Sequence, residues 1–313
     1  MFIQIKWLIS PAQNKALKRN KNKILIILAF FSIYGIWGST YLLNKIAVTE
    51  IPAFSLAALR FLIAGVLILL LAKILKKPLQ ISKKQFLNAT IAGFLFLVYG
   101  NGVFVWALNY IDSSFAALLA STQPLFVLLL MRLIDGKKMQ VKSIIGVVLG
   151  MIGMYLLVSQ QGILAKEGSL LAIFVMFTCV LSWSYGSIFV SKADLPKNFF
   201  VSTGYQMIIA GVLLLMISLR LQETWLLPSD WSFEAQLSVI GLILFGGIVA
   251  FTAFNFLLKN VSPEKVATSA YVNPIVAMIL GWCVLDEQLS IQSIIASVVL
   301  LTGVYFITSR KRL

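Results

Sequence analysis

The chain has 313 residues, of which 60% are hydrophobic and only 12% are charged, with a mean hydropathy of +0.95. A soluble domain carries about 25% charged residues, so this chain cannot hide its apolar surface in a water-soluble core, and lipid must surround it. The net charge of +15 does not indicate a nucleic-acid partner, because the basic residues lie in short segments between apolar runs. Histidine is absent and both cysteines lie in apolar runs, so neither a metal or other cofactor nor a disulfide framework is expected.

The chain begins with a basic stretch, residues 1–23, which holds six Lys and Arg residues and lacks the pattern of a signal peptide. We expect it to be a cytoplasmic tail. Ten apolar runs of membrane-spanning length follow, separated by short polar segments, which predicts an all-α integral membrane protein with ten transmembrane helices. The runs cover about residues 24–43, 53–74, 86–107, 112–133, 140–158, 169–190, 199–219, 236–257, 264–285 and 290–308.

A segment near the middle of the chain recurs 150 residues later, near its end. A similar spacing of 146 residues links Trp37 to Trp183. The chain therefore contains a duplicated unit, with a first copy at 24–160 and a second at 169–310, of five spans each. The recurring residues are Ser143, Ile144, Ile145, Gly153, Tyr155 and Ser159, which return as Ser293, Ile294, Ile295, Gly303, Tyr305 and Ser309.

The Lys and Arg residues predict the orientation in the membrane. If the N-terminus lies in the cytoplasm, 22 of the 26 basic residues fall on the cytoplasmic side and 4 on the outer side. This bias predicts two cytoplasmic termini. We expect a multi-pass protein of the bacterial cytoplasmic (inner) membrane. Because five is an odd number of spans, the two copies must be inverted relative to each other, which is typical of alternating-access transporters.

All eleven carboxylates of the sequence lie in predicted loops or at the ends of spans. An acid in the middle of a membrane usually marks a path for protons or cations. Its absence from the spans argues against tight proton coupling and favours facilitated diffusion or exchange.

Two amide–proline pairs, Gln123-Pro124 and Asn273-Pro274, lie 150 residues apart at the middle of the fourth and ninth predicted spans. Proline removes a backbone donor and frees a carbonyl, and polar groups exposed at matching positions of two repeats are typical of a substrate site. The alternative is that both prolines only kink their helices and that the amides bond to neighbouring spans.

Other polar and aromatic residues within spans complete the candidate substrate site. A mid-span aromatic residue is more often a packing residue than a ligand contact, whereas an unpaired amide is costly in hydrocarbon and should face the bundle interior. Lys45 and Arg60, near the outer ends of the first two spans, either snorkel to the interface or form a charge-selecting rim. The substrate-site candidates are Trp37, Asn101, Gln123, Trp183, Tyr185, Asn255, Tyr271, Asn273 and Trp282.

Four stretches of the chain follow one another in a characteristic order: WGSTYLLNK (37–45), Pro52 with LAALRFLIAG (56–65), SSFAALLASTQP (113–124) and ATSAYVNPIVAMILGWCVLDEQLS (267–290). In this order and in two tandem units, the chain resembles the EamA family of the drug/metabolite transporter superfamily over residues 24–310. The resemblance implies ten helices around a central cavity and the movement, commonly outward, of amino acids or related metabolites. We expect a small-molecule substrate and membrane lipid as partners, and a monomer or homodimer.

The first unit departs from the family pattern in one place. After its fourth helix, the second unit keeps an acidic turn, Asp286-Glu287, where the first unit has Asp135-Gly136-Lys137-Lys138. Because this turn lies at the rim, we expect the loss of a rim contact there and not the loss of transport.

Two other functions stay open at this point. An uptake or exchange carrier for an anionic or nucleotide-like metabolite would use Lys45 and Arg60 to neutralise the charge of its substrate. A membrane-embedded enzyme is the alternative of another class, and it is disfavoured because the sequence has no histidine, no G-x-S-x-G motif and no mid-span acid.

Overall fold

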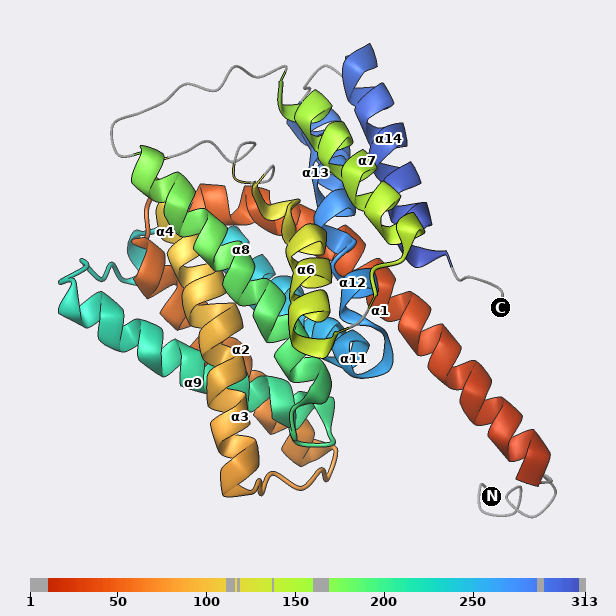
Figure 1. The fold of residues 1–313 in the computed structure, drawn as a ribbon. Coiled ribbons are helices and arrows are strands. Elements are labelled where there is room, and N and C mark those ends of the chain that lie inside the picture. The colour runs from red at the N-terminus through yellow and green to blue at the C-terminus, as the bar shows by residue number, and fades with distance from the viewer. Residues whose placement is uncertain are drawn as a thin grey trace.

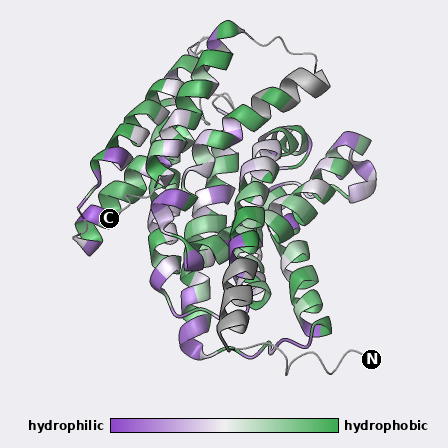
Figure 2. Cartoon of the chain, turned by 90° about the vertical axis from the view of Figure 1, so that its right-hand side faces the viewer, coloured by the Kyte–Doolittle hydropathy of each residue, from purple (hydrophilic) through white to green (hydrophobic). Residues whose placement is uncertain are grey.

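The computed structural model of the chain describes residues 11–110, 116, 119–136, 138–159, 169–285 and 290–309. Over these residues the chain forms helices joined by turns and short irregular segments, without a β-strand. Hydrophobic residues cover most of the helices, and hydrophilic residues gather toward helix ends and connecting turns (Figure 2). The prediction of an all-helical membrane protein is confirmed at this level.

Six helical stretches of the described part are long and apolar enough to cross a membrane. The shortest of them have 22 residues, or about 33 Å of helix, which matches a hydrocarbon core of about 30 Å. Shorter apolar helices cover Val141–Leu156 and Ile294–Thr308. The six stretches are Asn22–Val48, Ala53–Ile74, Lys83–Ala107, Leu170–Lys192, Phe199–Arg220 and Phe233–Asn260.

The third and eighth predicted spans share an unusual feature, since each is interrupted by a π-helix at the equivalent position of its unit. The first half of the chain contains α1 (Pro11–Val48), α2 (Ala53–Ile74), α3 (Lys83–Gly93), the π-helix η1 (Phe94–Val103), α4 (Phe104–Ala107), α6 (Gln123–Asp135) and α7 (Val141–Val158). The second half contains α8 (Ser169–Lys192), α9 (Phe199–Arg220), the 3-10 helix η2 (Pro228–Asp230), α10 (Phe233–Gly241), the π-helix η3 (Leu242–Phe251), α11 (Thr252–Asn260), α12 (Pro263–Val266), α13 (Ser269–Leu285) and α14 (Ile291–Thr308).

The N-terminal part of α1 projects from the bundle (Figure 1). Residues 11–23, expected as part of a tail, continue the first span as one helix that starts at Pro11. Residues 1–10 of the expected tail lie outside the described residues.

The equivalent helices α2 and α9 pack antiparallel against each other (Figure 1). A Cβ at Gly65 would lie 2.7 Å from Ile208 Cγ1, and a Cβ at Gly211 would lie 2.7 Å from Leu62 Cγ. The earlier contact residue of α2, Leu62, meets the later contact residue of α9, Gly211, so the two helices run in opposite directions. Gly65 and Gly211 are equivalent positions of the repeat, so each unit lacks a side chain where the other comes closest.

A second antiparallel pair, α7 and α14, lies at the edge of the bundle (Figure 1). A Cβ at Gly146 would lie 2.6 Å from Gly303 O, and one at Gly153 would lie 3.0 Å from Ala296 O. In the repeat, Gly146 corresponds to Ala296 and Gly153 corresponds to Gly303. Each glycine of α7 therefore contacts the residue of α14 that corresponds to the other glycine. The pairing therefore has the local two-fold relation that is also seen between α2 and α9.

Two carboxylates connect the halves of the chain at helix starts. The backbone N–H groups of Phe54 and Ser55 in α2 donate to Glu223, which follows α9, at 3.2 and 2.7 Å. The hydroxyl and the backbone N–H of Ser232, the N-cap of α10, donate to Glu50 at 2.5 and 2.8 Å. The hydrogen bonds from Ser232 hold the pKa of Glu50 below its usual value. Each half thereby satisfies backbone donors at a helix start of the other half.

We expect Gly150→Ala to lower the thermal stability of the purified protein, because the buried ring of Tyr271 packs directly on this glycine. An added Cβ would lie 2.2 Å from Tyr271 Cζ, and overpacking of this kind costs about 1–3 kcal/mol. Gly35→Ala is the matched control, since a Cβ at Gly35 would have no neighbouring atom of the described residues outside its own helix turn within 4 Å. Thermal unfolding in detergent measures both variants, and an unchanged midpoint for Gly150→Ala would contradict this packing.

Candidate functional site

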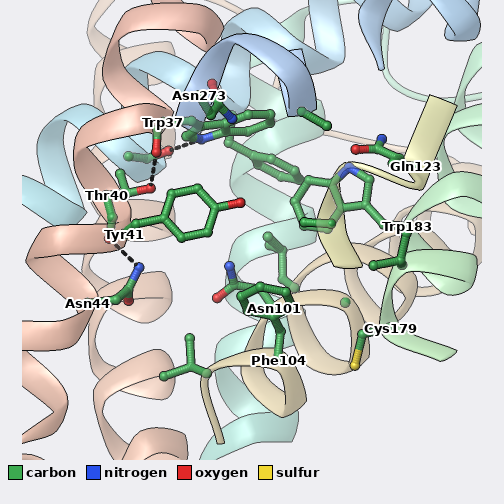
Figure 3. Close-up of a pocket in the computed structure, with 18 of the residues that line it drawn as sticks. Trp37, Thr40, Tyr41, Asn44, Asn101, Phe104, Gln123, Cys179, Trp183 and Asn273 are labelled. Carbon is green, nitrogen blue, oxygen red and sulfur yellow. Dashed lines mark hydrogen bonds between the residues drawn. The ribbon is translucent and has the colours of Figure 1, made fainter. Parts of the chain in front are cut away.

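A cavity of about 140 Å³ lies between helices of both halves of the chain. Its walls come from α1, α2, η1, α4 and α6 of the first half and from α8, η3 and α13 of the second, and Figure 3 shows most of these side chains. The lining mixes aromatic rings with amides and hydroxyls, and its one charged side chain among the described residues is Arg60. A concave space with an apolar body and a few polar groups is typical of a small-molecule site.

One face of α1 forms a wall of the cavity. Trp37, Thr40, Tyr41 and Asn44 line it at spacings of three and four residues, so they share one side of the helix. The Thr40 hydroxyl donates to the Trp37 carbonyl, and the Asn44 amide donates to the Thr40 carbonyl, both at 2.8 Å. The Tyr41 hydroxyl points into the cavity and has no hydrogen-bond partner among the described residues (Figure 3), so it is free to bind a ligand.

The repeat-equivalent residues Trp37 and Trp183 meet in the cavity wall. Their rings pack edge to face, with centroids 5.8 Å apart and an interplanar angle of 80°. The ring of Phe254 lies 5.0 Å from Trp37 and 5.6 Å from Trp183. Phe96 lies 5.0 Å from Trp183, and both phenylalanines are fully buried. These four rings form an aromatic cluster, of which Trp37 and Trp183 line the cavity.

Both π-helices contribute to the walls, through Gly100 and Asn101 of η1 and through Gly246 and Phe251 of η3. A Cβ at Gly100 would lie 2.9 Å from the indole of Trp183, so glycine permits this close approach. Such π-helical turns are rare and frequently mark functional sites.

Side chains from neighbouring helices bond to carbonyls of the π-helices. In η1, the carbonyl of Leu95 accepts from Ser182 at 2.9 Å and that of Tyr99 accepts from Cys179 at 3.2 Å. In η3, the Gly246 carbonyl accepts from the Trp37 indole at 3.4 Å. These bonds connect η1 to α8 and η3 to α1, which are equivalent pairs of elements in the two halves.

The two prolines have different positions in their helices. Pro124 lies in the first turn of α6, directly after a turn at residues 121–122, whereas Pro274 lies inside α13. Each proline lacks the donor that would serve a helical carbonyl four residues earlier. Those earlier residues, Ala120 and Ala270, both line the cavity.

The two amides beside these prolines also differ. With its nitrogen turned toward the carbonyls around it, Asn273 donates to Ile33 and Tyr34 of α1, at 3.1 and 3.2 Å, and to Ser269 at 3.1 Å. Asn273 thus ties α13 to α1, as the alternative interpretation of the pair expected. The side chain of Gln123 forms no hydrogen bond within the described part of the chain and is free to bind a ligand.

Three candidates lie away from the cavity. Tyr185 is 42% exposed, because it follows Trp183 by two residues and so points to the opposite face of α8. Asn255 is buried between α11 and α9, where it bonds to Gln206 at 3.3 Å and to Thr203 at 3.4 Å. Tyr271 packs against α7 and α14. In the structure Tyr185 therefore lies on the outer surface of the bundle, and Asn255 and Tyr271 pack between helices, so none of the three lines the cavity.

The remaining candidates are the two basic residues, Lys45 and Arg60, and Trp282 of the ninth predicted span. The side chains of Lys45 and Trp282 lie outside the described residues. Arg60 is only 5% exposed and does not snorkel to the interface, since its guanidinium donates to Asn101 and lies over the ring of Phe61. The structure therefore brings together Trp37, Arg60, Asn101, Gln123, Trp183 and Asn273.

Several lining residues were not among the candidates: Thr40, Tyr41, Asn44, Phe104 and Cys179. The signal that could have found the first three is the helical spacing from Trp37 along α1. Phe104 follows Asn101 by three residues, and Cys179 precedes Trp183 by four, so the same spacing applies to them.

A membrane transporter must wrap its solute away from lipid, and a cavity of polar and aromatic groups enclosed by apolar helices provides that space. The fold and this site define a multi-pass integral membrane protein of the transporter class. The model of the EamA-like transporter family matches residues 23–159 and again residues 170–309. The chain belongs to this family, within the drug/metabolite transporter superfamily, as two tandem units.

Curated relatives agree with this assignment. The inner membrane transporter YedA of Escherichia coli (strain K12) is 35% identical over 287 residues, which cover 91% of each chain. The transporter YoaV of Bacillus subtilis (strain 168) is 24% identical, with coverage of 92% of this chain and 99% of its own. These relatives support the expected place in a bacterial inner membrane.

A solved crystal structure shares the fold, with a TM-score of 0.75 over 90% of this chain and 96% of the other. At 18% identity, that similarity concerns the fold alone.

We expect the two repeat-equivalent amides to respond differently to truncation. Asn273→Ala removes the amide that donates to the carbonyls of α1 and Ser269 and should lower stability by about 1–2 kcal/mol, whereas Gln123→Ala should leave stability nearly unchanged. Gln123→Ala should instead reduce solute flux. Unfolding midpoints of the purified variants, together with flux in vesicles, measure the difference. Equal losses of stability in both variants would contradict the distinction.

Proposed function

We propose that the chain is an alternating-access carrier that moves small organic solutes, namely amino acids or related metabolites, outward through this cavity. The observation that carries the proposal is the meeting of Trp37 and Trp183 in the cavity wall. Because these residues occupy equivalent positions of the two units, the cavity lies where the units face each other. Substrate and coupling sites of repeat-built transporters lie at this interface.

The proposal includes ten spans in two inverted five-helix units with both termini in the cytoplasm. The antiparallel packing of α2 on α9 and of α7 on α14 supports it, because equivalent helices related by inversion must run in opposite directions. The contacts also exchange equivalent positions, as Gly65 with Ile208 and Leu62 with Gly211 do. Two inverted copies of one unit can exchange conformations, which opens the cavity to one side and then to the other.

In this orientation the cavity faces outward. Its lining runs from Trp37 to Asn44 along α1, toward the turn that joins α1 to α2, and Arg60 lies at the same end. That turn belongs to the outer side when the N-terminus is cytoplasmic. The aromatic cluster then lies below the cavity and blocks the path to the cytoplasm.

The chemistry of the lining favours facilitated diffusion or exchange over tight proton coupling. None of its described residues is a carboxylate, and the sequence has no histidine. Tyr41, Asn101 and Gln123 provide neutral polar groups, and the indoles provide apolar surface. Arg60 also makes uptake or exchange of an anionic metabolite a second candidate function. An embedded enzyme finds no support in the lining or in the family.

Flux in proteoliposomes tests the proposed function. Vesicles with the full chain, loaded with the twenty common L-amino acids, should release at least one of them faster than protein-free vesicles. Trp183→Ala should reduce that rate about tenfold, because the substrate loses an aromatic wall. Trp225→Ala is the control, since this residue lies in the loop after α9 and bonds to Ser218. Mass spectrometry of the released solutes measures the rates, and no release above background would refute amino-acid transport.

Cysteine labelling tests the orientation. In a background without Cys179 and Cys283, Thr40→Cys should react with a membrane-impermeant thiol reagent that is added to the outside of intact cells. Ser39→Cys is the control, because Ser39 lies one residue away and does not line the cavity. Labelling of Thr40→Cys only after the cells are opened would contradict an outward-facing cavity.

A further inference from the structure

Arg60 is a buried cation within a membrane-spanning helix. It lies seven residues after Ala53, the first residue of α2, and thus about 10 Å from the start of the helix. Its side chain is 5% exposed and lines the cavity. An ionisable residue at such a depth is rare unless it serves a function, because the surrounding lipid and protein solvate charge poorly.

The described surroundings compensate this charge only in part. One terminal nitrogen of Arg60 donates to the side-chain amide oxygen of Asn101, and the guanidinium carbon lies 4.5 Å from the centre of the Phe61 ring. Its Nε is buried without a hydrogen-bond partner among the described residues. No described residue of the lining carries a negative charge. Removing such a cation from water costs several kcal/mol, and a cation–π contact returns only about 1–2 kcal/mol of that cost.

Within the described part of the chain no counter-charge faces Arg60, and this indicates what the cavity accepts. A guanidinium has five N–H donors in a planar fork that matches a carboxylate, and the Asn101 contact uses only one of them. The amide nitrogen of Asn101 points into the cavity beside Tyr41 (Figure 3). Arg60, Asn101 and the Tyr41 hydroxyl thus place donors at one end of the cavity, and Trp37 and Trp183 place apolar surface at the other.

We infer that the transported solute carries a carboxylate, which binds to Arg60 with Asn101 beside it, while its apolar part lies against the indoles. This inference rests on the proposed transport function and specifies its substrate class. A cation without an acid group is disfavoured, because Arg60 repels it. A phosphate monoester is also disfavoured, because a doubly charged group needs several basic donors and the described lining offers one.

Binding of matched compounds to the purified full chain tests the inference. The probes are 3-phenylpropionate with 3-phenylpropanamide, and L-phenylalanine with L-phenylalaninol, which differ only in the carboxylate. The acid should bind at least about tenfold more tightly than its partner in one or both pairs, since a charge-assisted hydrogen bond contributes about 1.5–3 kcal/mol. Isothermal titration measures the dissociation constants, and phenyl phosphate serves as a third probe.

Substitutions assign the preference to Arg60. Arg60→Gln should abolish the preference for the acid, because it weakens the binding of the acids and leaves the binding of the neutral amide unchanged. Arg60→Lys should retain part of the preference, because lysine keeps the charge but not the planar fork of donors. Arg132→Gln is the matched control, since Arg132 lies on an exposed face in the last turn of α6. If Arg60→Gln does not fold, as judged by its elution and unfolding midpoint, Asn101→Ala replaces it and should weaken the acids several-fold.

Three results would overturn the inference: equal binding of acid and neutral partner, no binding of either acid, or a preference that persists in Arg60→Gln. Tighter binding of phenyl phosphate than of the acids would overturn it as well. The flux assay separates this failure from that of the proposed function. If the wild-type chain moves solutes without preference for a carboxylate, only the substrate class falls. If it moves none, the transport proposal falls too.

Discussion

The structure depends on the close approach of equivalent helices from the two halves of the chain. In lipid, apolar side chains gain little by leaving their surroundings, so helices associate through close packing where side chains are small. Gly65 and Gly211 provide this between α2 and α9, and Gly146 and Gly303 provide it between α7 and α14. These contacts bring equivalent helices of the two units together in opposite directions. The position of the cavity between them follows from that arrangement.

Once the apolar surface is packed or faces lipid, the remaining polar groups acquire distinct roles. Some connect helices, as Asn273 does between α13 and α1 and Asn255 between α11 and α9. Others stay free of described partners and face the cavity, as Gln123 and the Tyr41 hydroxyl do. Hydrogen-bond partners, and not residue type, separate the groups that hold the bundle together from those available to a solute.

Much of the helical fold could be predicted from the sequence, because long apolar runs and a repeat are properties of the chain itself. The site could be predicted only in part. Trp37 and Trp183 were identified by their equivalence, but Tyr185 and Tyr271 carry no mark of the direction in which they face. The rotation of a helix about its axis is decided by contacts such as Gly150 with Tyr271, which join residues far apart in the sequence. Arg60 illustrates the same limit, since only the fold reveals that it is buried beside Asn101.

The π-helices η1 and η3 have a consequence for how the cavity walls can move. A π turn accommodates about one residue more than an α turn, and a shift of that extra residue along the helix would require only a local exchange of hydrogen bonds. Each shift by one residue turns the side chain that it passes by about 100° around the axis. Asn101 lies within such a segment, so a small sliding of the bulge would rotate its amide out of the wall while the helix stays whole. The equivalent segment η3 contributes Gly246 and Phe251 to the lining, so a shift there would turn those residues in the same way.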